Sequence, residues 1–119
     1  MTISTKISGY WQRFDGDNLE LNHRISESVT VTEGGGNRIV LASNITNISI
    51  MPPGLTTVRA LYIETDNKLN IEITGVRVAS FDIYSDPGVF VMLNASLSNV
   101  RLSNRSATVT CNPFYDLSG

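Results

Sequence analysis

Short segments in which apolar and polar residues alternate recur along this chain, and Gly, Pro, Asn or Asp ends each of them. The clearest lie between Val58 and Tyr84, where an apolar segment, a turn at residues 66–68 and an alternating segment from Leu69 to Ile73 follow one another. A period of two places alternate side chains on opposite faces of a strand. The pattern therefore predicts a β-hairpin between Val58 and Tyr84, and no segment has a convincing helical period.

The spacing of these segments predicts the fold class. About eight short strands with turn residues between them are typical of an antiparallel sandwich or small barrel. We expect an all-β protein, an antiparallel, jelly-roll-like β-sandwich, and 119 residues suit one such domain. The expected boundaries are an N-terminal arm or first strand at 1–18, the sandwich at 19–112 and a C-terminal tail at 113–119.

Three segments give more specific expectations. The strand from Leu19 to Thr32 carries His23 and Glu27 on its apolar side, which predicts a bulge or bend between residues 24 and 28. Glycines 34–36 precede a strand rather than a helix, so they predict a flexible hairpin tip and not a phosphate site. Residues 89–93 are all apolar, which predicts a strand buried on both faces after a turn at 86–88. Segments 97–102 and 107–111 should form the last strand pair.

Composition and isolated reactive residues argue against several functions. A net charge of −2 argues against a nucleic-acid partner, since proteins that bind nucleic acid usually have a basic face, although folding could still gather distant Arg residues into a patch. The single cysteine, Cys111, fits a small buried strand residue, with a reactive thiol or an intermolecular disulfide as alternatives. His23 has no nucleophile motif beside it, and the turn at 15–18 lacks the downstream ligands of a calcium loop. We expect no catalytic, metal or cofactor site, no secretion signal and no membrane span.

Aromatic residues near both ends are the best candidates for a functional surface. They are more sensible if they dock onto another chain, because aromatics and Arg are enriched at interface hot spots and unanchored chain ends are usually disordered. The alternative for Trp11 is an anchor in the core. A closed homo-oligomer is the expected arrangement, with a trimer as the favoured order. The candidate subunit contacts are Tyr10, Trp11, Arg13, Phe14, Phe114 and Tyr115.

Two strand pairs carry a resemblance to a known group of proteins. Residues 28–32, the glycine-rich tip and residues 37–43 resemble small virion-associated proteins of tailed bacteriophages. Residues 58–66 and 69–75 do so as well, and 96–110 resembles the final Asn-rich hairpin of those proteins. The likeness covers most of 28–111 and rests on strands and turns, without a catalytic motif to transfer. It implies a β-sandwich accessory protein that decorates the capsid or belongs to the neck, tail or fibres.

These observations together predict a non-enzymatic structural protein of the virion, assembled in the bacterial cytoplasm. Its partners would be major capsid or tail proteins, and as a decoration or cement protein it would stabilise the particle through subunit contacts. The alternative is a tail, neck or fibre component that binds host-surface glycans. Aromatic platforms with nearby carboxylates would serve that role, and the nearest set in the sequence is Tyr10, Trp11, Asp15 and Asp17.

Overall fold

All regular structure in the described residues is β-strand. The computed structural model describes residues 3–84 and 88–119, so the centre of the turn expected at 86–88 lies outside them. No helix in this part of the chain is long and apolar enough to cross a membrane. The strands are β1 (Ile3–Asp15), β2 (Asn18–Val31), β3 (Gly34–Arg38), β4 (Ile45–Ser49), β5 (Val58–Thr65), β6 (Leu69–Thr74), β7 (Val78–Ile83), β8 (Gly88–Leu97), β9 (Asn99–Asn104) and β10 (Phe114–Ser118).

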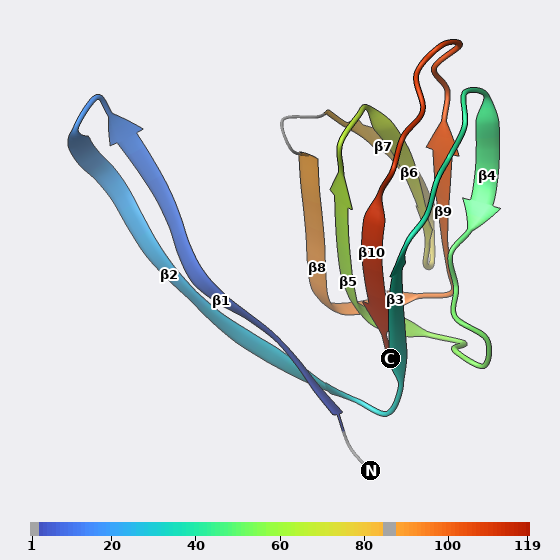
Figure 1. The fold of residues 1–119 in the computed structure, drawn as a ribbon. Coiled ribbons are helices and arrows are strands. Elements are labelled where there is room, and N and C mark those ends of the chain that lie inside the picture. The colour runs from blue at the N-terminus through green and yellow to red at the C-terminus, as the bar shows by residue number, and fades with distance from the viewer. Residues whose placement is uncertain (1–2, 85–87) are drawn as a thin grey trace.

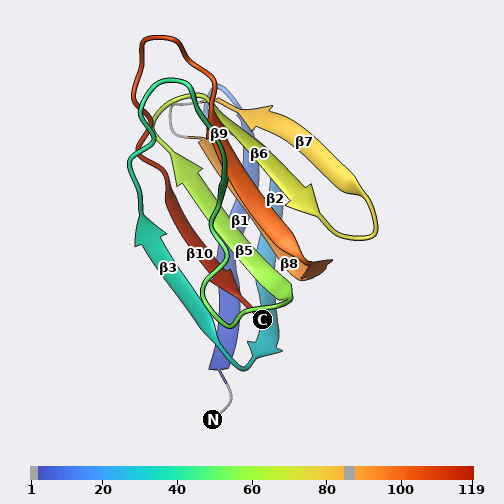
Figure 2. The same ribbon diagram turned by 90° about the vertical axis from the view of Figure 1, so that its right-hand side faces the viewer.

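Strands β3 to β10 pair in a nested order. The central hairpin β6–β7 is enclosed by the pairs β5–β8, β4–β9 and β3–β10, all antiparallel. The chain thus forms one long double strand that is rolled into two sheets, with orders β3-β10-β5-β8 and β4-β9-β6-β7. Figures 1 and 2 show the two sheets stacked face to face. This arrangement is a jelly roll, and it confirms the predicted fold class with eight strands in the sandwich.

The core lies between the two sheets and comes from alternate residues of the central strands. Leu61 and Ile63 of β5 face Ile71 of β6 and Leu102 of β9, and all four are at most 2% exposed. Edge-to-face packing of Phe81 on Phe90, with ring centroids 4.8 Å apart, closes one side of the sandwich. The alternation of Leu69, Ile71 and Ile73 therefore did identify the buried face of β6.

Strands β1 and β2 form a hairpin that projects from the sandwich, which we call the arm (Figure 1). Gly16, with φ of 59°, turns the chain at its tip. Thirteen residues at about 3.3 Å each make the arm roughly 43 Å long. The radius of gyration is 15.5 Å, whereas a compact chain of this length should have about 13.5 Å. The arm accounts for this excess.

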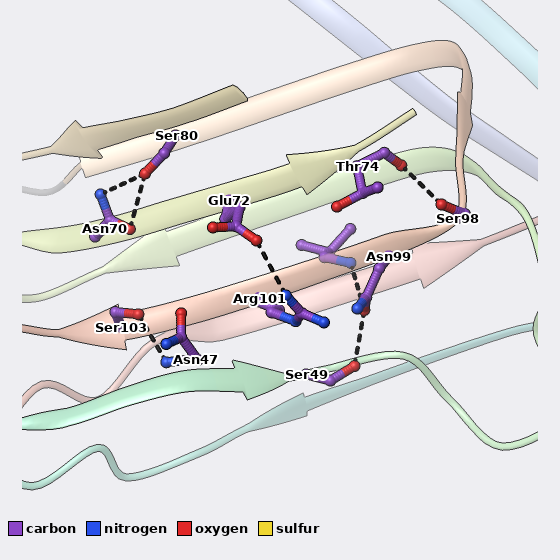
Figure 3. Close-up of polar contacts among 11 residues, drawn as sticks. Asn47, Ser49, Asn70, Glu72, Thr74, Ser80, Ser98, Asn99, Arg101 and Ser103 are labelled. Carbon is purple, nitrogen blue, oxygen red and sulfur yellow. Dashed lines mark hydrogen bonds and ion pairs between the residues drawn. The ribbon is translucent and has the colours of Figure 1, made fainter. Parts of the chain in front are cut away.

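The outward faces of the two sheets differ in polarity. The outward face of β4-β9-β6-β7, which we call the polar face, carries hydrogen-bonded side chains (Figure 3). Arg101 donates to Glu72 at 3.2 Å, and Ser49 donates to Asn99 at 2.9 Å. The outward face of β3-β10-β5-β8 carries Ala60, Tyr62, Val91, Leu93 and Phe114 instead, and we call it the arm-side face because the arm begins on it. The polar face is thus the more hydrophilic of the two, although Val78 is exposed on it.

The prediction of a hairpin between Val58 and Tyr84 is wrong about which strands pair. Strands β5 and β6 lie in different sheets, and residues 66–68 cross from one sheet to the other. The true hairpin of this region is β6–β7, in which Ile71 faces Phe81. Alternation in the sequence indicates which side chains share a face of a strand, but it does not indicate which other strand pairs with it.

The glycine run is part of a strand and not a hairpin tip. Strand β3 pairs with β10, and a Cβ on Gly36 would lie 2.7 Å from the carbonyl oxygen of Tyr115. A Cβ on Gly34 would lie 2.8 Å from the Cβ of Ser118. These glycines allow close approach of β10, which no local sequence pattern announces.

Other boundaries also differ from the expectation. The bulge lies between Arg13 and Phe14, opposite Glu20, and not between residues 24 and 28. His23 and Glu27 are exposed on the arm, so no bulge is needed to turn them outward. The arm extends to Val31, and residues 114–118 form β10 inside a sheet where a tail was expected. Residues 107–111 contribute only the bridge between Leu41 and Cys111.

The strand at residues 89–93 is also less buried than predicted. It belongs to β8, which is the edge of its sheet. Val89 is 49% exposed and residues 90–93 are only partly buried. An edge strand lacks a neighbour on one side, and its outward face here is only partly covered.

The core predicts the cost of cavity formation. Leu61→Ala should lower the free energy of unfolding by about 2–5 kcal/mol, because Leu61 is 2% exposed between the sheets. Urea denaturation followed by circular dichroism measures this change. Val76→Ala is the control, since Val76 is fully exposed and its truncation should change stability by less than about 0.5 kcal/mol. Equal effects of the two substitutions would contradict the assignment of the core.

Candidate functional site

The arm has two faces of different character. Cross-strand partners share a face, so the register assigns every side chain. The inner face, which continues from the residues that touch the sandwich, carries Ile3, Thr5, Ile7, Gly9, Trp11, Arg13, Leu21, His23, Ile25, Glu27, Val29 and Val31. The outer face carries Ser4, Lys6, Ser8, Tyr10, Gln12, Asn22, Arg24, Ser26, Ser28 and Thr30. The inner face is mainly apolar and the outer face is polar except for Tyr10.

The base of the arm is seated on the arm-side face. Val29 and Val31 are 4% and 2% exposed and form a small cluster with Ala60, against which Leu93 packs. The hydroxyl groups of Thr5 and Ser118 are 2.8 Å apart. This second apolar cluster holds the start of β1 and the end of β2 on the sandwich.

The distal half of the arm has no such cover. Trp11 is 66% exposed, Tyr10 62% and Phe14 55%, and Leu19 and Leu21 are exposed beside them. Arg13 pairs with Glu20 across the hairpin at 3.3 Å. A two-stranded hairpin is at best marginally stable alone in water, and clustered exposed apolar residues mark interaction sites. The distal arm is therefore the strongest candidate surface for binding another molecule.

The predicted contact residues separate into two groups. The structure brings Tyr10, Trp11, Arg13 and Phe14 together on the distal arm, although Tyr10 and Trp11 lie on opposite faces. Phe114 and Tyr115 lie far from them in β10 and are partly buried. Phe114 packs edge to face on Tyr62 at 6.1 Å, and Tyr115 packs against the core. Their apparent exposure in the sequence came from treating β10 as a tail.

Leu19, Leu21 and Ile25 also belong to the distal arm, and the sequence analysis did not single them out. Their alternation was visible, but it predicted a sandwich strand and so a buried face. Only the pairing of the full length of β2 with β1 places these residues away from the sandwich. The pairing of Trp11 with His23 likewise places the only histidine of the sequence on the exposed arm.

A cleft of about 330 Å³ lies where the arm leaves the sheet, and we call it the arm cleft. Residues 5–8 of β1 form one wall, and Tyr62, Val91 and Leu93 line the opposite wall with Asp116. Burial raises the pKa of the Asp116 carboxyl above its usual value, and none of the described residues forms an ion pair with it. The arm cleft is thus an apolar space with one desolvated carboxyl group.

A second cleft of about 420 Å³ lies at the end of the sandwich, and we call it the polar cleft. Its walls are Asn67, Lys68, Asn70, Asp82, Asn104, Arg105, Ser106 and Val109. Lys68 lies 3.7 Å from Asp82, and its ammonium group lies 5.3 Å from the ring centre of Tyr84. Amide groups and charges of both signs give this cleft many hydrogen-bond donors and acceptors.

The surroundings of Cys111 and the arrangement of the described acidic residues do not favour a reactive centre. Cys111 is fully buried, its sulfur lies 2.9 Å from the Thr65 hydroxyl, and desolvation raises the pKa of its thiol. Nucleophilic cysteines need the opposite shift. Among residues 3–84 and 88–119, no three His, Cys, Asp or Glu side chains are grouped so that they could hold a metal ion.

Comparisons with known proteins returned no match to a family model, to a curated protein or to a solved structure. The fold and surfaces described above define an all-β protein, a jelly-roll sandwich with a projecting amphipathic arm.

The carboxyl group of Asp116 predicts a pH dependence of stability. Its pKa is raised above 3.8 in the folded state, so the folded protein binds more protons than the unfolded chain just above that value. Stability from this group is present at lower pH and is lost as pH rises through the folded pKa. Asp116→Asn should therefore raise the urea midpoint at pH 7 and leave it nearly unchanged below pH 3.8.

Asp66→Asn is the control with the opposite sign. The backbone N–H of Asn112 donates to Asp66 at 2.8 Å and lowers its pKa. This carboxylate stabilises the fold above its unfolded pKa, and that contribution is lost as pH falls through the folded pKa. Asp66→Asn should lower the urea midpoint at pH 7, and the same direction of change in both variants would contradict the assignments.

Proposed function

We propose that this protein is a non-enzymatic structural subunit of a tailed-phage particle, a decoration or cement protein that stabilises the particle through contacts made by its arm. Its partners are other copies of the chain and the major capsid or tail proteins. The resemblance of residues 28–111 to virion-associated proteins supplies the phage context. The arm supplies the surface through which the subunits would contact one another.

One observation carries this proposal: the inner face of the arm is mainly apolar, but within residues 3–84 and 88–119 only its base is covered. Val29 is 4% exposed near the base, whereas Trp11 is 66% exposed farther out on the same face. Burying apolar area is worth roughly 25 cal/mol per Å², and aromatic anchors are common hot spots of interfaces. An arm of this kind is stabilised when another subunit covers it.

The jelly-roll fold is compatible with a structural role in a phage particle, but it does not distinguish this role from sugar binding. Jelly rolls occur in viral capsid proteins and also in lectins. Function must therefore be argued from the exposed surfaces and not from the fold. The arm favours assembly, because it extends the molecule beyond the sandwich to reach a neighbour (Figure 1).

The proposal predicts how the chain is distributed in purified particles. Quantitative mass spectrometry should find it at a copy number comparable to that of the major shell protein. Trp11→Ala/Phe14→Ala should reduce that number severalfold, because interface aromatics of this kind typically contribute about 2 kcal/mol or more.

Val40→Ala/Val76→Ala is the matched control, since both valines are exposed on the sandwich. It should leave the copy number unchanged, and both double variants should keep the urea midpoint of the parent. A handful of copies would move the protein to the neck, tail or fibre. Absence of the parent chain from particles would overturn the proposal.

The polar cleft favours a second candidate function, binding of a host-surface glycan. Its amide groups and its carboxylate, Asp82, are the groups that bind sugar hydroxyls. The set expected from the sequence is less suited, because Tyr10 and Trp11 point to opposite faces of the arm and cannot form one platform. In this alternative the arm would position the cleft, and Trp11 would remain exposed.

This alternative predicts glycan binding that depends on the cleft and not on the arm. Asp82→Asn should weaken binding of a glycan found by array screening at least tenfold, whereas Trp11→Ala should leave the affinity unchanged in calorimetric titration. Iodide quenching of Trp11 in assembled particles separates the two functions. Strong quenching would support the glycan binder, and weak quenching would support a buried arm.

A further inference from the structure

We propose that the polar cleft binds a sugar that carries an anionic oxygen group, a carboxylate or a phosphate, and that Arg105 recognises this group. The inference rests on the second candidate function, glycan binding, and names the class of glycan. The polar cleft follows the end of β5, whereas the arm contacts Ala60 near the start of that strand (Figure 1). The polar cleft and the base of the arm therefore lie at opposite ends of the sandwich.

Two loops contribute most of the walls of the polar cleft, and hydrogen bonds hold them to each other. The first loop joins β5 to β6, and the second joins β9 to β10. The side-chain amide of Asn67 in the first loop donates to the carbonyl oxygen of Thr110 in the second at 3.0 Å. Both carboxylate oxygens of Asp66 accept hydrogen bonds from Asn112, at 2.8 and 3.0 Å. Walls that are fixed before a ligand arrives lower the entropic cost of binding it.

Polar side chains also fix the second loop internally. Asn104 is 1% exposed, and its side-chain amide donates to the carbonyl oxygens of Leu41 and Val109. The side-chain carbonyl of Asn104 accepts from the backbone N–H of Ser106. The Ser106 hydroxyl oxygen in turn accepts from the backbone N–H groups of Thr108 and Val109, at 3.2 and 2.9 Å. Because both lone pairs of this oxygen are then used, its O–H group is left to donate to a ligand.

The charged groups of the polar cleft are not equally available to a ligand. Asp82 accepts from the side-chain amide of Asn70 at 3.0 Å and lies 3.7 Å from the Lys68 ammonium group. The same ammonium group lies 5.3 Å from the ring centre of Tyr84, so two neighbours hold it. Arg105 is exposed and forms no ion pair with any residue in the described part of the chain. Its guanidinium is therefore the cation with which a ligand can pair.

Positive charge and hydrogen-bond donors are in excess in the polar cleft. Lys68 and Arg105 outnumber the carboxylate of Asp82 in its walls, although the whole chain has a net charge of −2. The guanidinium, the ammonium group and the Ser106 hydroxyl are all donors. A guanidinium presents two parallel N–H groups that match the oxygens of a carboxylate or a phosphate. An anionic oxygen group is thus the ligand chemistry that complements this cleft.

The remaining walls suit the ring and the hydroxyl groups of a sugar. Asp82 and the side-chain carbonyl of Asn67 are acceptors for hydroxyl groups, and Val109, which is 44% exposed, offers an apolar contact to ring carbons. Asn70 is 6% exposed and bonded to Ser80 (Figure 3), so its amide holds Asp82 in place. The volume of about 420 Å³ is within the ~300–1,000 Å³ typical of small-molecule sites. The cleft therefore has room for a sugar ring together with its acidic group.

NMR titrations of the isotope-labelled full-length chain test this inference. Glucuronate is compared with glucose, and galacturonate with galactose, because the members of each pair differ only in whether the terminal carbon is a carboxylate. Glucose 6-phosphate tests the phosphate form, and inorganic phosphate tests the anion alone. At low ionic strength an acidic sugar should bind roughly tenfold or more tightly than its neutral counterpart, with shifts at Lys68, Arg105 and Ser106. Added salt should reduce this difference.

Four substitutions separate the recognition of the anion from the binding of the sugar. Arg105→Gln should reduce the affinity for the acidic sugar to that of the neutral one without changing the urea midpoint. Arg105→Lys should retain part of the preference, since it keeps the charge but lacks the planar fork. Arg77→Gln is the matched control, because Arg77 is exposed between β6 and β7, outside the cleft, and its loss changes the net charge equally. Asp82→Asn should weaken the binding of neutral as well as acidic sugars.

The outcomes separate this inference from the proposed functions. Equal affinities for a neutral sugar and its acidic counterpart, or an unchanged preference in Arg105→Gln, would overturn the inference. Inorganic phosphate that bound as tightly as glucose 6-phosphate would also overturn it, because the cleft would then recognise an anion and not a sugar. A neutral glycan that bound in an Asp82-dependent manner would keep the second candidate function alone. The copy number in particles tests the leading function and does not depend on these titrations.

Discussion

Apolar residues lie on both faces of one sheet, and the rest of the architecture depends on how those two faces are covered. Inward, β5 and β10 present Leu61, Ile63 and Leu117 to the other sheet, which completes the core. Outward, the same strands present Ala60, Tyr62 and Phe114, which another sheet does not cover. The other sheet has less need of such cover, because hydrogen-bonded polar side chains line most of its outward face (Figure 3). The arm covers part of this outward face.

This partial cover connects the fold to the proposed function. The arm seats Val29 and Val31 on the sheet and then diverges from it, leaving an apolar cleft at the point of divergence. Beyond that point its inner face remains mainly apolar, and the described part of the chain does not cover it. A surface that continues a buried contact past its own partner is suited to a second molecule.

Local pattern predicted the class of the fold and the inward face of most central strands. Alternation at Leu69, Ile71 and Ile73 identified core positions because burial between two sheets selects the same period of two. Which strands pair with one another was harder to predict from the sequence. Strand β5 pairs with β8 and β10, which follow it by more than twenty and more than forty residues, and no short pattern encodes such partners. The glycines of β3 were misinterpreted for this reason, since their role depends on the approach of β10.

The candidate surface was predicted only in part for the same physical reason. Tyr10, Trp11, Arg13 and Phe14 were identified from their chemistry, and they do lie together on the arm. Leu21 and Ile25 were assigned to a core face, because an amphipathic strand has the same pattern whether its apolar face meets its own sandwich or another chain. Phe114 and Tyr115 were assigned to a surface, because a short strand near a chain end resembles a tail until its neighbours are known.

The seating of the arm has a consequence for the order of events during synthesis. Thr5 of β1 meets Ser118 of β10, a separation of 113 residues, and the surface beneath the arm comes from β5, β8 and β10. The ribosome therefore releases the arm well before the strands that will hold it. During that interval its apolar side has only nascent chains nearby, and polysomes place several of these close together. A segment made early and seated late is exposed to premature association, and the polar outer side of the arm limits that association to one face.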